Sequence, residues 1–205
     1  MNKLSKQKII FYGLIGAIVL LLAVGVFAFT RSRFNVLPQI ISSSSSQSNT
    51  LTAFPEVATA SLSDSQKEVL RLLKEEYKTQ PAGTKYSAGV SEAWCADFVS
   101  WIFNEAGVPL SNPNSGYWRI PGTFTLRDYY EQAGRFKAAN SGYSPKVGDI
   151  MLYDNPSPFG QHTNIVIENT NGVITTIGGN EPGGIRIFKH TTKDDAGFIG
   201  YGEFL

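Results

Sequence analysis

The chain of 205 residues has very little cysteine, little histidine and almost no net charge. Its single cysteine excludes an intramolecular disulfide framework and any cysteine-rich zinc or iron–sulfur site. Its two histidines leave few ligands for a metal, so neither a metal nor another cofactor is expected. A net charge of +1 gives no electrostatic footprint for nucleic acid. Specificity must then come from a pocket, and the thiol of Cys95 is free for chemistry of its own.

One long apolar run is present, at the N-terminus. Residues 9–29 are apolar or glycine apart from Tyr12, and at ~1.5 Å per residue they predict a transmembrane helix across a hydrocarbon core of ~30 Å. A cleaved signal peptide is the alternative, but its apolar region is normally ~7–15 residues and ends at a small-x-small site. Lysines precede the run, which predicts that residues 1–8 are cytoplasmic. We therefore expect a single-pass protein of the cell membrane whose larger part is extracytoplasmic.

Residues 30–62 predict a flexible linker. They contain a run of serines from Ser42 to Ser46, and few large side chains are present whose burial could offset the entropy of ordering. We place the domain boundary near Leu62, so residues 63–205 are expected to fold as one domain.

Patterns typical of helices come first in that domain. Ser63 followed by Gln66 matches a capping box and predicts a helix over 64–79. A second helix is expected to begin at Cys95, because apolar residues recur at helical spacing from there to Ala106. A shorter third helix is expected over 124–132.

Patterns typical of strands follow. Five short strands are expected, over 150–153, 165–168, 173–177, 185–188 and 198–201. Helices followed by antiparallel strands, with no βαβ alternation, predict an α+β domain in which the helices pack on one face of an antiparallel sheet.

Cys95 is expected in the first turn of its helix, where unpaired N–H groups and the helix dipole stabilise a thiolate. A histidine partner would complete its activation. His162 begins a predicted strand and is the stronger candidate, whereas His190 lies in a polar run typical of a solvated strand end. From the residues alone, Cys95 could equally be a small buried apolar side chain, and His162 a residue that hydrogen-bonds a turn.

The segment from Ser91 to Trp101, with Trp94-Cys95-Ala96-Asp97 at its centre, resembles the signature of CHAP domains, the cysteine, histidine-dependent amidohydrolase/peptidase family. Further resemblances follow in family order, at Gly107-Val108-Pro109, Val147-Gly148-Asp149-Ile150, His162 before its apolar strand, Ile177-Gly178-Gly179-Asn180 and Gly200-Tyr201-Gly202. The resemblance implies a papain-like fold and a peptidoglycan hydrolase. Such an enzyme would cut the N-acetylmuramoyl–L-alanine amide or a peptide bond in the stem or cross-bridge.

The resemblance also implies catalytic roles. Cys95 would attack the amide carbonyl, His162 would pass the proton to the leaving amine, and a third group would orient the imidazole. Many family members read Glu-x-Asn where this chain reads Gly178-Gly179-Asn180, so the acidic position is lost here. Asn180 is therefore the predicted third residue, and Asp154 and Glu181 are further candidates for that role.

Three further functions fit parts of this pattern. A sortase-like transpeptidase places its histidine before its cysteine, whereas Cys95 here comes before His162. An NlpC/P60-type cysteine peptidase shares the order and the substrate, and the run from Trp94 to Trp101 favours CHAP. A membrane-tethered wall-binding or scaffold module with weak or no catalysis stays open because of Gly178. The expected partners are peptidoglycan, the membrane and a regulatory cell-wall protein that restrains the enzyme.

Overall fold

The computed structural model describes residues 51–158, 160–191 and 195–205. The described residues belong to one compact unit, Leu51–Leu205. The predicted membrane span 9–29, the cytoplasmic segment 1–8 and the first part of the predicted linker lie outside the described residues. Within the part of the chain that the structure describes, no helix is long and apolar enough to cross a membrane.

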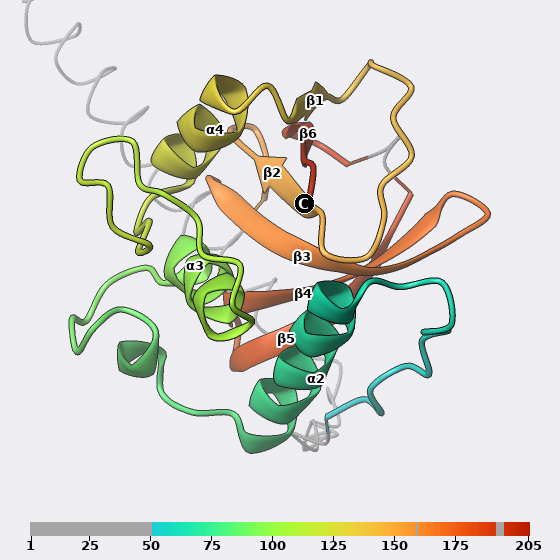
Figure 1. The fold of residues 1–205 in the computed structure, drawn as a ribbon, viewed down its shortest axis with the longest axis horizontal. Coiled ribbons are helices and arrows are strands. Elements are labelled where there is room, and N and C mark those ends of the chain that lie inside the picture. Colours follow the sequence, from blue (N-terminus) through green and yellow to red (C-terminus); the bar gives the residue numbers. More distant parts are fainter. Residues whose placement is uncertain (1–50, 159, 192–194) are drawn as a thin grey trace, which may run out of the picture. The chain divides into compact units, whose positions relative to one another are not determined.

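Helices precede strands along the described chain, as predicted (Figure 1). The helical elements are α2 (Asp64–Thr79), the 3-10 turn η1 (Gly83–Lys85), α3 (Cys95–Glu105) and α4 (Thr123–Gln132). The strands are β1 (Phe136–Ala138), β2 (Ile150–Tyr153), β3 (His162–Thr170), β4 (Val173–Glu181), β5 (Gly184–His190) and β6 (Phe198–Gly202). They form one sheet in the order β1-β6-β2-β3-β4-β5, and every neighbouring pair is antiparallel. The predicted α+β class is confirmed, with β1 as a short strand that the pattern did not predict.

The capping box of α2 forms as its sequence predicts. Ser63 Oγ accepts a hydrogen bond from the backbone N–H of Gln66 at 3.2 Å, and the Gln66 side chain accepts one from the Ser63 N–H at 2.9 Å. The helix ends where Gln80 takes a left-handed conformation with φ 49°. These local contacts satisfy N–H groups that a helix start otherwise leaves unpaired.

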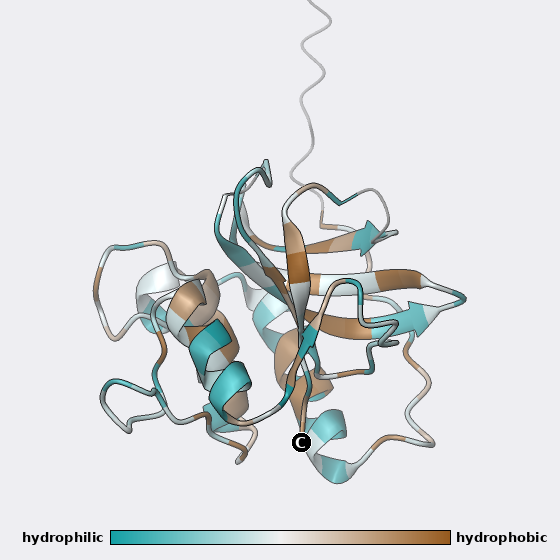
Figure 2. Cartoon of the chain, turned by 90° about the horizontal axis from the view of Figure 1, so that it is seen from above, coloured by the Kyte–Doolittle hydropathy of each residue, from teal (hydrophilic) through white to brown (hydrophobic). Residues whose placement is uncertain are grey.

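The sheet is apolar on both faces. The larger core joins the helices to one face, with Phe98, Val99 and Ile102 of α3 packing near Ile165 and Ile177. A smaller apolar cluster lies on alternate residues of the strands, which is the opposite face, and consists of Met151, Tyr153, Val166, Ile174 and Tyr201. Figure 2 shows apolar colour along the central strands, while the helices carry both polar and apolar stripes.

The hairpin of β3 and β4 is longer than predicted. Its turn uses Asn171 and Gly172, both at positive φ, which is typical of a two-residue hairpin turn. Each strand is 9 residues long rather than the four or five that the pattern indicated. Because the strands are antiparallel, the first residue of β3 and the last of β4 lie at the same end of the hairpin. Those residues are His162 and Glu181.

The segment before α2 is packed rather than free. Leu51, Phe54 and Val57 pack against the core, and the hydroxyl of Tyr77 donates to the carbonyl of Thr52 at 2.8 Å. The compact unit therefore begins at Leu51, and residues 51–62 of the predicted linker belong to it. A few apolar side chains matched to the surface of α2 are enough to order a segment whose composition is otherwise polar.

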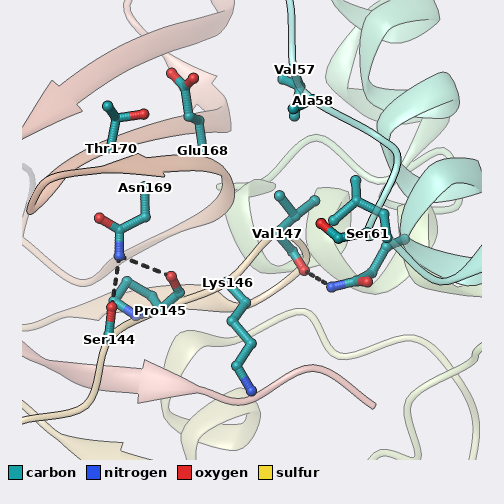
Figure 3. A pocket seen from close by; sticks show the side chains of 12 residues that line it. Val57, Ala58, Ser61, Ser144, Pro145, Lys146, Val147, Glu168, Asn169 and Thr170 are labelled. Carbon is teal, nitrogen blue, oxygen red and sulfur yellow. Dashed lines mark hydrogen bonds between the residues drawn. The ribbon is translucent and has the colours of Figure 1, made fainter.

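A pocket of about 580 Å³ lies between this segment and the hairpin (Figure 3). Its wall includes Ser61 and Glu168, and Asn169 closes one side by donating to Ser144 and to the Pro145 carbonyl, both at 3.0 Å. Glu168 and Asn169 are near the end of β3 opposite to its first residue, His162. This pocket is therefore remote from the predicted catalytic residues.

Candidate active site

Cys95 is the first residue of α3, the position that the sequence predicts for it. Its N-cap, Trp94, makes no side-chain capping hydrogen bond. The first N–H groups of an α-helix have no partner within the helix, so they and the dipole favour a thiolate at this point. The side chain is only 6% exposed. The thiol therefore lies in a largely dehydrated setting at a helix N-terminus.

Trp94 holds the backbone just before Cys95. Its ring stacks on Tyr86 with centroids 5.2 Å apart and 16° between the planes. A Cβ atom at either Gly83 or Gly179 would overlap the indole, so the ring is enclosed by η1 on one side and β4 on the other. Both glycines are thus required by the position of the indole, which in turn fixes where α3 begins.

His162 is the first residue of β3 and is 4% exposed. Its imidazole Nε2 lies 2.7 Å from Glu181 Oε1, and the ring is also hydrogen-bonded with the side chain of Cys95. Burial lowers the pKa of His162, but the hydrogen bonds and charges of Cys95 and Glu181 outweigh burial and raise it to about 10. The structure thus brings together a thiol, an imidazole and a carboxylate in one line of contacts, with the imidazole bonded to both of the others.

The side chain that contacts the imidazole is that of Glu181, one of the two alternative candidates, and not that of Asn180. Asn180 is exposed and has a left-handed backbone with φ 60°. The pairing of β4 with β5 shifts its register between Gly178 and Glu181. A shift of this kind changes which residues face a given side of the sheet. The contact that the sequence predicts for Asn180 is therefore made by its neighbour Glu181.

Asp154 and His190 make their contacts with residues outside this line. Asp154 is half-buried, and its side chain accepts from the N–H of Asn155 at 2.7 Å. His190 is paired with Asp195, with 3.0 Å between Nδ1 and Oδ2, and its Nε2 lies 3.0 Å from Thr176 Oγ1. The expectation that His190 is a solvated strand end is wrong, because its side chain is only 12% exposed.

Asn164 is a further polar residue near the imidazole. It lies two residues after His162 on the same strand, so both side chains leave the same face. One end of its amide faces Glu181 Oε1 at 3.2 Å, the carbonyl of Thr163 at 2.8 Å and His162 Nε2 at 2.8 Å. With the amide nitrogen assigned to that end, Asn164 donates to both oxygens. The sequence motifs did not single out this residue, although an asparagine just before the apolar run of β3 was a usable signal.

Asp97 supports the first turn of α3. Its carboxylate is fully buried and accepts from Arg119 Nε at 2.7 Å, and Arg119 also pairs with Glu92. Burial raises the pKa of Asp97 to about 6, with Arg119 limiting the rise. Arg119 therefore connects the segments before and after α3 to the turn that carries Cys95.

Among the residues that the structure describes, no group of three or more His, Cys, Asp or Glu side chains is placed to bind a metal ion. The groups that surround the thiol are suited to a different task. An imidazole held by a carboxylate and bonded to a thiol is the arrangement used in nucleophilic catalysis by cysteine.

Comparison with known proteins bears on this site. No curated protein and no solved structure matches the chain significantly. A family model, that of the CHAP domain, matches residues 85–180, which include Cys95 and His162 and end one residue before Glu181. The chain therefore carries a CHAP domain at residues 85–180.

Proposed function

We propose that this protein is a peptidoglycan hydrolase that cleaves an amide bond with Cys95 as its nucleophile. CHAP domains are typically cysteine hydrolases of peptidoglycan. The observation that carries the proposal is the line formed by Cys95, His162 and Glu181, in which a thiol at a helix N-terminus bonds a buried imidazole that a carboxylate holds.

In the first half of the reaction, the Cys95 thiolate attacks the carbonyl carbon of the scissile amide. The carbonyl oxygen becomes an oxyanion, and the backbone N–H of Cys95 at the start of α3 is one donor available to it. The C–N bond then breaks as the His162 imidazolium gives its proton to the leaving nitrogen. The products of this half are a free amine and a thioester on Cys95.

In the second half, water attacks the thioester carbonyl while neutral His162 takes its proton. Collapse of the second oxyanion releases a carboxylic acid and restores the thiolate–imidazolium pair. Glu181 stabilises the imidazolium through Nε2 in both halves and fixes the ring orientation, which is a positioning role.

The test uses the full-length protein in detergent micelles with purified peptidoglycan. The wild type is expected to release soluble fragments, and Cys95→Ala is expected to release none. Mass spectrometry of the fragments then identifies the bond. A stem with a free L-alanine N-terminus marks an amidase, and a new N-terminus within the stem or cross-bridge marks an endopeptidase. A wild type that binds the wall without releasing fragments would instead support the binding or scaffold module.

We also propose that residues 9–29 anchor the protein in the cell membrane, with the CHAP domain on the extracytoplasmic side. The support is the length of the apolar run and the lysines before it. In intact protoplasts, an added protease should degrade the CHAP domain and leave an N-terminal fragment with the membrane. Release of the whole protein by an alkaline wash would contradict the anchor.

A further inference from the structure

Gly178 stands at the position where the acidic residue was expected, and its surroundings explain its lack of a side chain. Gly178 is buried near the C-terminal end of β4, three residues before Glu181. A Cβ atom built there would overlap the amide of Asn164 and would come within 2.7 Å of Glu181 Oε1. The space that a side chain at 178 would use is therefore filled by two polar groups from other positions.

The Asn164 amide is enclosed by acceptors on one side. That side holds two oxygens, the Thr163 carbonyl at 2.8 Å and Glu181 Oε1 at 3.2 Å, and also His162 Nε2 at 2.8 Å. The amide nitrogen is assigned to this side because the opposite orientation would set an amide oxygen against the two oxygens. The other end of the amide lies 3.4 Å from the hydroxyl of Thr176. With a side chain that is 2% exposed, Asn164 has no water to replace these contacts.

The Glu181 carboxylate depends on few donors. Oε1 accepts from His162 and from Asn164, whereas Oε2 is buried without a hydrogen-bond partner among the described residues. A buried carboxylate held through one oxygen can rotate if one of its donors is removed, and its alignment with the imidazole is then no longer fixed.

We propose that Asn164 is a positioning residue that holds the Glu181 carboxylate against His162, and that Gly178 lacks a side chain because this amide occupies its space. Glu181 and Asn164 together thus replace an acidic side chain at position 178. The kinetic part of this inference rests on the proposed hydrolase function, whereas its structural part does not.

The first experiment measures the pKa of the His162 imidazole in the full-length protein by nitrogen NMR. The chain has only two histidines, so His190→Gln assigns the two signals. The pKa of His162 is expected to fall toward its ordinary value in Asn164→Ala, because the carboxylate no longer stays beside the ring. Asn164→Leu fills the same space without a donor, so it should give the same fall and covers the case in which the alanine variant does not fold.

The second experiment measures kcat/KM on soluble peptidoglycan fragments. Asn164→Ala and Asn164→Leu should each lower it about 10- to 100-fold, the usual effect of removing a group that orients a reacting residue. Asn169→Ala is the matched control, since Asn169 is on the same strand and also bonds neighbouring groups, but lies at the far end. Its kcat/KM should stay at the wild-type value.

The third experiment is a double-mutant cycle that pairs Gly178→Ala with Asn164→Ala. Gly178→Ala alone should lower kcat/KM as Asn164→Ala does, because its Cβ displaces the amide. The double variant should lose little more than either single variant, since both act on one contact.

The inference is overturned if Asn164→Leu keeps the wild-type pKa of His162, since the amide would then serve only to fill space. If the losses in kcat/KM from Gly178→Ala and Asn164→Ala simply add in the double variant, the explanation given for the glycine at position 178 is also overturned. If the wild type hydrolyses no peptidoglycan, the proposed function fails, while the NMR measurement still decides on Asn164.

Discussion

The two histidines of this protein are built into similar networks, yet only His162 is bonded with the thiol of Cys95 among the residues that the structure describes. His162 pairs with Glu181 at 2.7 Å, and His190 pairs with Asp195 at 3.0 Å. The difference lies in the group on the other side of each ring. His162 is bonded with the thiol of Cys95 at a helix N-terminus, whereas His190 meets the hydroxyl of Thr176 in the interior of the sheet. A histidine–carboxylate pair is thus not itself a sign of a reaction, and the nucleophile beside it decides.

The largest expected effect separates these two histidines directly. His162→Ala should lower kcat/KM at least about 10³-fold, because the imidazole both stabilises the thiolate and protonates the leaving amine. His190→Ala should lower it less than about tenfold, since His190 bonds Thr176, Tyr153 and Asp195, none of which takes part in the proposed reaction. Rates on soluble peptidoglycan fragments measure both. Equal losses in the two variants would remove the distinction.

The second effect compares the carboxylates. Glu181→Gln should lower kcat/KM about 10²-fold, because the neutral amide holds the ring but stabilises the imidazolium poorly. The kcat/KM of Asp195→Asn should remain within about threefold of the wild-type value, because Asp195 does not contact the groups proposed to react.

Asn180→Gly is the control that tests which residue orients the imidazole of His162. Glycine keeps the left-handed backbone at position 180 while removing the amide. A variant as impaired as Glu181→Gln would return that role to Asn180.

The third effect concerns pH. His162 has a pKa raised to about 10, so kcat/KM should fall as the pH rises through about 10 and the imidazolium is lost. The same raised pKa contributes stability that is fully present below the ordinary imidazole value of 6.5 and is lost as the pH rises toward 10. In Glu181→Gln this basic limb should move to lower pH. Rate measurements across the basic range check the shift, and a limb that stays in place would separate Glu181 from His162.

How much the sequence could predict follows from how local each feature is. The capping box at Ser63 and the start of α3 at Cys95 depend on neighbours within one helical turn, and both predictions are confirmed. The ordered segment from Leu51 was missed because its order comes from contacts with α2, which composition does not report.

The candidate site was predictable up to the point where the sheet becomes irregular. The resemblance to CHAP domains, with Gly178 at the acidic position, favoured Asn180 for the third role and left Glu181 as an alternative. The register shift between Gly178 and Glu181 moves the contact to the next residue. Asn164 could not be identified from the sequence for a related reason. Its amide fits beside Glu181 only because Gly178, on the neighbouring strand, has no side chain. The catalytic roles of these residues stay predictions.

The smallest expected effect tests whether the two histidine networks are independent where they come closest. Tyr153 lies opposite His162 in the pairing of β2 with β3, yet its hydroxyl donates to Asp195 at 3.0 Å. Tyr153→Phe should lower the free energy of unfolding by about 0.5–1.5 kcal/mol, the usual contribution of one hydrogen bond, and leave kcat/KM unchanged. In the background of Asp195→Asn the same substitution should cost less, because its partner is weakened. Denaturant unfolding measures the first quantity. A fall in kcat/KM without loss of stability would show that the network around His190 acts on His162.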